Sequence, residues 1–107
     1  MSSDRSAPYL NKLVTTGIGH GQKDNVSAGT DLVLAASTAC KWVMVQGATD
    51  NTGVIAVGAS GVDATVDGGT GVALAAGESM TIPADDLADF YFDASVSGDA
   101  IRYTYGT

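Results

Sequence analysis

The stretches DFYFD (residues 89–93) and IRYTY (residues 101–105) decide the fold class of this chain. In the first, the two phenylalanines share one side and the two aspartates the other. In the second, apolar and aromatic residues alternate with Arg102 and Thr104. A period of two is typical of β-strands that bury one face. Gly98-Asp99, between the two stretches, indicates a hairpin-like turn. The pattern therefore predicts two half-buried strands joined by a short connection.

Similar short apolar runs, separated by turn residues, fill the rest of the chain after residue 26. Fourteen glycines against two prolines indicate many tight turns, and the only helical signal, at residues 83–89, is too short to form an element of the fold. We therefore predict an all-β fold, a small β-sandwich or jelly-roll-like barrel of about seven or eight short strands. The runs at 42–45 and 54–57 do not alternate, so we expect both of their faces to be covered, one by the core and the other by a neighbouring subunit.

The first 25 residues have a different character. They are mostly small and polar, carry three of the five basic residues, and contain one apolar island around Tyr9 and Val14. The glycines at 17, 19 and 21 follow without the spacing of a nucleotide-binding loop, and we interpret them as a flexible joint. The sequence therefore predicts an extended N-terminal arm (residues 1–25) and one β-sandwich domain (residues 26–107).

Composition excludes several classes of function. Twelve acidic residues against five basic ones give a net charge of −7, which argues against a nucleic-acid partner. No apolar run approaches the roughly 20 residues of a membrane span, and the first residues lack the pattern of a signal peptide. The single cysteine, Cys40, has no disulfide partner and is expected to be a small buried thiol. We therefore expect synthesis in the cytoplasm and no membrane contact.

No constellation of residues indicates catalysis or metal binding. The only histidine, His20, stands between glycines, and no nucleophile-elbow motif accompanies it. The aspartates at 63 and 67, and those at 85, 86 and 89, lack the spacing of a calcium loop and are expected to be solvated. We interpret the aromatic residues on the expected strands as core. The sequence predicts no catalytic, cofactor-binding or metal-ligating residue, and a protein that is not an enzyme.

Several short motifs resemble, as a set, a pattern common in small virion proteins of tailed bacteriophages. They are NTGVIAVG (residues 51–58), LAAGES (residues 74–79), DDL (residues 85–87) with YFDA (residues 91–94), and Gly98-Asp99 with Tyr103. The resemblance covers residues 30–107, about three quarters of the chain. It implies a small β-sandwich that serves in capsid decoration or in head and tail accessory roles, without catalytic residues.

The resemblance and the composition together favour a capsid decoration, or cement, protein on the virion surface, made in the cytoplasm of the host bacterium. Its partners would be the major capsid protein, whose subunits it bridges, and further copies of itself, with a trimer favoured over a dimer. The alternative is a tail, collar or fibre-associated structural protein that contacts host glycans through exposed tyrosine or tryptophan. The residues predicted to form interfaces are Tyr9, Leu10, Leu13 and Val14 of the arm, and Trp42, Met44, Val54 and Val57 of the domain.

Overall fold

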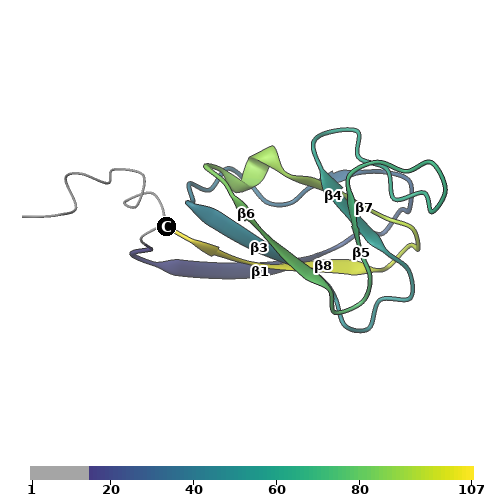
Figure 1. Ribbon diagram of the computed structural model, residues 1–107, viewed down its shortest axis with the longest axis horizontal. Helices are drawn as coiled ribbons and strands as arrows, with labels where there is room; N and C mark the ends of the chain where they lie inside the picture. Colours follow the sequence, from purple (N-terminus) through teal and green to yellow (C-terminus); the bar gives the residue numbers. More distant parts are fainter. Residues whose placement is uncertain (1–14) are drawn as a thin grey trace, which may run out of the picture.

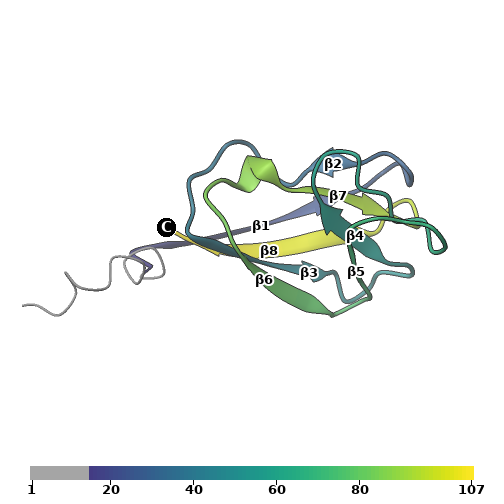
Figure 2. The same cartoon turned by 45° about the horizontal axis from the view of Figure 1, so that its top comes forward.

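The computed structural model describes residues 15–107, which form two antiparallel sheets of four strands each (Figures 1 and 2). The first sheet has the order β1-β8-β3-β6 and the second the order β2-β7-β4-β5. One short 3-10 turn, η2 (Leu87–Asp89), precedes β7. The predicted small all-β sandwich is confirmed. Its strands are β1 (Ile18–Asp24), β2 (Leu32–Val33), β3 (Trp42–Gly47), β4 (Ile55–Gly58), β5 (Val72–Leu74), β6 (Ser79–Pro83), β7 (Tyr91–Ala94) and β8 (Ala100–Gly106).

The main core lies between the two sheets and follows the predicted alternation. Phe92 of β7 and Ile101 of β8 are fully buried, whereas Arg102 is exposed. Strand β3 shows the same alternation, because Val43 and Val45 point into the core. Burial of such apolar side chains is the main force that holds the two sheets together. The remaining large members of this core are Leu34, Ile55, Val57, Leu74 and Leu87.

Residues 18–24, which the sequence assigned to the arm, form strand β1 of the first sheet. This strand pairs with β8 along its whole length, so the expected flexible joint at residues 17–21 belongs to the sheet. The physical reason is close packing: a Cβ atom at Gly21 would overlap the ring of Tyr103, and one at Gly19 would overlap the ring of Tyr105. The glycines make room for aromatic rings. The apolar island at residues 9–14 lies outside the described residues.

The glycine-rich loop at residues 59–71 covers the outer face of the second sheet. Val62 and Ala64 of the loop are buried against Ala56 of β4, and Tyr91 packs beside them. Both faces of β4 are therefore covered, as predicted, but the second cover is the chain's own loop and not a neighbouring subunit. The run in β3 was also predicted to have both faces covered. Within the described residues its outward face is open, because the side chain of Met44 is 43% exposed.

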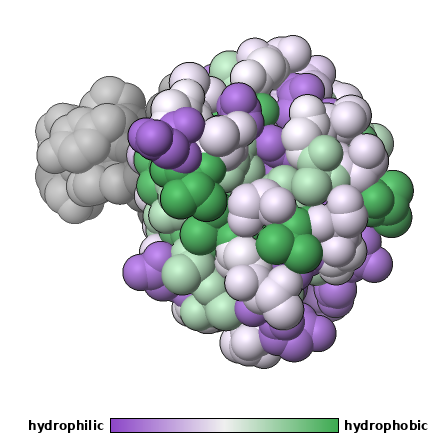
Figure 3. Space-filling view, turned by 90° about the vertical axis from the view of Figure 1, so that its right-hand side faces the viewer, coloured by the Kyte–Doolittle hydropathy of each residue, from purple (hydrophilic) through white to green (hydrophobic). Residues whose placement is uncertain are grey.

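A buried carboxylate fixes this loop to its neighbours. Asp93 is only 1% exposed, and its two oxygens accept hydrogen bonds from the N–H of Ala64 at 2.9 Å and the N–H of Gly29 at 3.0 Å. The side chain of Asn25, also fully buried, adds a third donor at 3.4 Å. A buried charge that accepts several hydrogen bonds is well compensated. Figure 3 looks onto the end of the molecule where these loops lie, and hydrophilic and hydrophobic residues are mixed there.

Two of the sequence motifs, at residues 51–53 and 98–99, form one hydrogen-bonded unit. The carboxylate of Asp99 accepts from the N–H of Thr52 at 3.1 Å and the N–H of Gly53 at 2.7 Å. The amide of Asn51 in turn donates to the carbonyl of Ala100 at 2.8 Å and accepts from its N–H at 2.9 Å. The residues at 51–53 and 98–99 therefore serve to hold the connection before β4 onto the start of β8.

Candidate binding face

The outward side of the first sheet is a candidate binding face. Residues directly opposite each other in an antiparallel pair point to the same side of the sheet, so the strand register arranges this face in rows. Two rows are largely polar, and the third is largely apolar. The rows are Gln22, Arg102, Gln46 and Ser79; His20, Thr104, Met44 and Thr81; and Ile18, Gly106, Trp42 and Pro83. We call these twelve residues the outer face.

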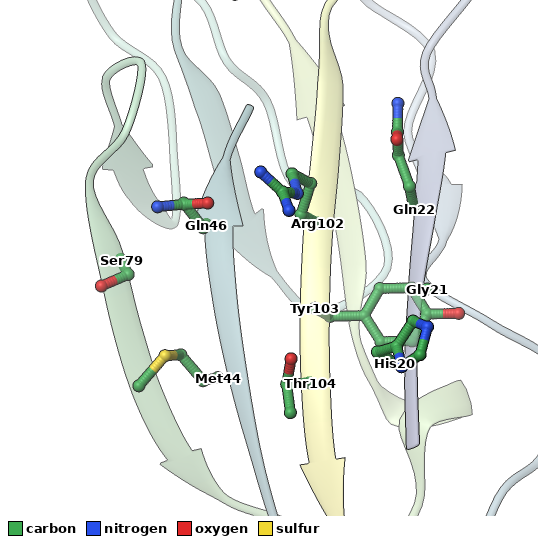
Figure 4. A pocket seen from close by; sticks show the side chains of 9 residues that line it. All are labelled: His20, Gly21, Gln22, Met44, Gln46, Ser79, Arg102, Tyr103 and Thr104. Carbon is green, nitrogen blue, oxygen red and sulfur yellow. The ribbon is translucent and has the colours of Figure 1, made fainter. Parts of the chain in front are cut away.

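The two polar rows surround a shallow hollow with a volume of about 430 Å³ (Figure 4). Arg102 lies between Gln46 on β3 and Gln22 on β1, with Thr104 and Met44 in the next row. Strand β6 contributes Ser79 to the wall of the hollow. The hollow is therefore built by side chains from all four strands of the first sheet.

Arg102 gives the outer face its charge. Within residues 15–107 its guanidinium makes no hydrogen bond or ion pair, whereas Lys23 donates to the carbonyl of Val33 at 2.7 Å and Lys41 also has a partner. The whole chain carries a net charge of −7, so an exposed arginine that makes no ion pair within the described residues stands out. A guanidinium offers donors in a planar fork that matches a carboxylate. The arrangement can bind an anionic group of a partner.

The glutamines on either side of Arg102 supply hydrogen-bond acceptors. The amide nitrogen of Gln46 donates to the carbonyl of Gly77 at 3.1 Å, and that of Gln22 donates to Asp24 at 3.4 Å. Each of these contacts uses the amide nitrogen and leaves the amide oxygen available to accept from a partner's N–H or O–H. Within the described part of the chain, the central row therefore combines one cation that has no partner with two hydrogen-bond acceptors.

The apolar row closes one end of the face. The indole N–H of Trp42 donates to the hydroxyl of Thr15 at 2.6 Å, and its ring lies against Gly106, where a Cβ atom would overlap it. Ile18, in the same row, is 70% exposed. This end of the face lies where the described part of the chain begins.

The structure unites only part of the predicted interface set. Trp42 and Met44 lie on the outer face, one row apart. Val54 is half-buried beside the glycine-rich loop, on the side of the second sheet, and Val57 is 3% exposed in the core. Tyr9, Leu10, Leu13 and Val14 lie outside the described residues.

Of the outer face, the sequence predicted only Trp42 and Met44, and the missed residues that give the face its binding chemistry are Gln22, Gln46 and Arg102. A signal existed for Arg102, because the alternation in residues 101–105 places it opposite the core. No such signal marked the two glutamines, since their positions beside Arg102 depend on which strands pair and in which register.

Two of the acidic residues considered as metal ligands, Asp63 and Asp86, have structural roles. The carboxylate of Asp86 accepts from the hydroxyl of Ser37 at 2.7 Å and from the N–H groups of Thr38 and Ala88 at 2.8 and 2.9 Å, and these bonds lower its pKa. Hydrogen bonds from the hydroxyl and N–H of Thr65 likewise lower the pKa of Asp63. In the part of the chain that the structure describes, no group of three His, Cys, Asp or Glu side chains could hold a metal ion.

The fold and the face define the class of protein: a small all-β sandwich with one open, polar sheet face. Comparison of the chain with protein-family models, curated proteins and solved structures finds no match. Within residues 15–107, no helix has the length and apolar character to cross a membrane.

Proposed function

We propose that this protein is a structural component of a tailed-phage virion, which decorates the capsid shell by binding the major capsid protein. The observation that carries the proposal is the outer face, a four-stranded surface in a strongly acidic protein, centred on an arginine that has no partner among residues 15–107. The resemblance of residues 30–107 to small virion proteins supplies the class of partner. The role is binding and not catalysis.

The chemistry of the face suits a protein surface. Arg102 would pair with a carboxylate of the shell, and the amide oxygens of Gln22 and Gln46 would accept main-chain N–H groups. Met44 adds a flexible apolar side chain that adapts to an irregular partner. Each contact is modest, but several copies bound to a repeating shell act together, and avidity raises the total affinity. A shell that resists the pressure of packed DNA needs many such attachments.

The first test is the copy number of the chain in purified virions, measured by mass spectrometry against the major capsid protein. We expect a simple ratio to the capsid protein, between one third and one, as repeated decoration of the shell requires. A few copies per particle would instead support the tail, collar or fibre alternative, and absence from the particle would overturn the proposal.

The second test is binding of added protein to shells that lack it. We expect Arg102→Gln to weaken binding by about tenfold or more, because it removes the cation while keeping a polar side chain. Val66→Asp is the matched control, since it shifts the net charge by the same amount at a residue 88% exposed in the glycine-rich loop. Equal binding by both variants would show that the outer face is not the attachment site.

The second candidate function, contact with host glycans, rests on Trp42. Its ring lies on the outer face beside polar rows, and aromatic rings next to amides and hydroxyls can hold sugars. Binding of purified host surface polysaccharide that is lost on Trp42→Ala, with capsid binding absent, would favour this function over the first.

A further inference from the structure

Strand β1 leaves an open edge on the first sheet. Among the strands of residues 15–107, its only partner is β8, although it is seven residues long and contains no proline. The other edge strands offer less: β2 has two residues, β5 has three, and β6 ends at Pro83, which has no N–H. Long, unprotected edges are templates for pairing with another strand.

The register shows which residues of β1 direct their N–H and C=O groups toward the open edge of the sheet. The N–H of Asn25 donates to the carbonyl of Asp99, and the N–H of Thr107 donates to the carbonyl of Gly17, both at 2.9 Å. Both pairs continue the β1–β8 register, in which hydrogen-bonded pairs alternate with non-bonded ones. The odd-numbered residues of β1 therefore bond to β8, and the even-numbered ones direct N–H and C=O to the open edge: Ile18, His20, Gln22 and Asp24.

We propose that this edge pairs with β1 of a second copy of the chain, antiparallel, across a two-fold axis at Gln22. In this register the outward main-chain groups of each copy meet those of the other. Gln22 stands opposite its own counterpart, and His20 stands opposite Asp24 of the partner subunit. The two-fold axis repeats this pair, so the basic, hydrogen-bonding side chain of His20 faces a carboxylate at two places in the dimer. No two like charges face each other. A two-fold axis at His20 would instead set the two histidines against each other.

The pairing would join the two first sheets into one continuous sheet of eight strands. Both copies of the outer face would then lie on one surface, each with its own Arg102. This arrangement gives a dimer, whereas the sequence favoured a trimer. It goes beyond the proposed function, because the dimer would form in the isolated protein whatever the partner of the outer face. Edge pairing buries little area, so we expect a dimer that dissociates on dilution.

The decisive variant is Gln22→Pro, studied in the full chain by sedimentation over a range of concentrations. Proline removes the outward N–H at this position but leaves the β8 side of the strand intact, because residues 21 and 23 make those bonds. Gln22→Ala is the matched control, since it shortens the side chain and keeps the N–H. We expect concentration-dependent dimers for the wild type and the alanine variant, and dissociation about tenfold or more easier for the proline variant.

Exchange of the charges at residues 20 and 24 tests the proposed register independently. It also tests the dimer if the Gln22→Pro variant does not fold. We expect Asp24→Lys and His20→Asp each to weaken the dimer, and the double variant to restore it, because the opposite charges are then exchanged. A wild-type protein that stays monomeric up to about 1 mM would overturn the proposal. So would a trimer insensitive to Gln22→Pro, or a double variant weaker than both single ones.

Discussion

The phenol ring of Tyr103 on β8 lies across Gly21 on β1, in the space where a Cβ atom would otherwise stand. Tyr105 and Gly19 repeat this relationship two residues along the pair, and the two tyrosine rings stack with centroids 6.3 Å apart. Aromatic residues opposite glycines shield the exposed glycine backbone and compensate for its weak strand preference. Close packing, and not chain flexibility, explains the glycines of β1.

Gly21→Ala should therefore destabilise the fold, although alanine is normally the better strand residue. The added methyl group must displace the Tyr103 ring, and overpacking of this kind costs about 1–3 kcal/mol. His20→Ala, at the neighbouring exposed position, should change the free energy of unfolding by less than about 0.5 kcal/mol. Urea denaturation of both variants measures the difference. In a Tyr103→Leu background the cost of Gly21→Ala should shrink, and an unchanged cost would contradict the packing argument.

The strands with apolar alternation could be predicted from the sequence, and β1 could not. Residues 101–105 carry their own buried face, as do those around Phe92. In β1 two of the three inward positions are glycines and the third is Lys23. The apolar surface that covers the two glycines comes from tyrosines more than 80 residues later in the chain. Hydrophobic periodicity within a segment cannot reveal a face that another strand supplies.

Asp93 should be the most sensitive carboxylate in the protein. Asp93→Ala would leave the N–H of Gly29 and the buried N–H of Ala64 without their acceptor, and we expect a loss of more than about 2 kcal/mol in the free energy of unfolding. Limited proteolysis should then cut within residues 59–71. The control is Asp67→Asn in the same loop, an exposed residue, which should behave as the wild type. Equal resistance of both variants to protease would show that Asp93 does not hold the loop.

The candidate binding face could also be predicted only in part, because some of its features depend on one strand and others on the pairing of strands. Arg102 could be placed on an open face from the alternation of its own strand. Its position between Gln22 and Gln46 follows only from the pairing of β8 with both β1 and β3. Val57 was expected at an interface, but its side chain lies in the core between the two sheets, whereas the glycine-rich loop covers Ala56 on the other side of β4. The run at residues 54–57 does not alternate, so the sequence did not show which of its side chains face the core.

Asp86 should make stability depend on pH in the acid range. The hydroxyl of Ser37 and the N–H groups of Ala88 and Thr38 lower its pKa in the folded protein, so the ionised form favours folding. This contribution is complete above the ordinary pKa of an aspartate, about 3.9, and is lost as the pH falls through the lowered folded value. Asp86→Asn should therefore be less stable than the wild type at pH 7, and its unfolding free energy should fall less between pH 5 and pH 3. Parallel pH profiles for the two proteins would contradict this assignment.

Cys40 is buried in the described structure, as the sequence predicted, and should react slowly. Burial raises the pKa of its thiol, and the negative charges of Asp86, Asp85 and Asp89 raise it further, so little thiolate is present at neutral pH. We expect labelling by a disulfide reagent at pH 7.5 to be at least about tenfold slower in the folded protein than in urea, because both access and thiolate content are reduced. Asp86→Asn removes one of the negative charges that raise the thiol pKa and should speed the reaction. Asp67→Asn is the control, because Asp67 lies in the glycine-rich loop, away from the thiol, and this variant should react at the wild-type rate. A folded-state rate equal to that in urea would mean that the thiol is open to solvent and that neither burial nor the aspartates protect it.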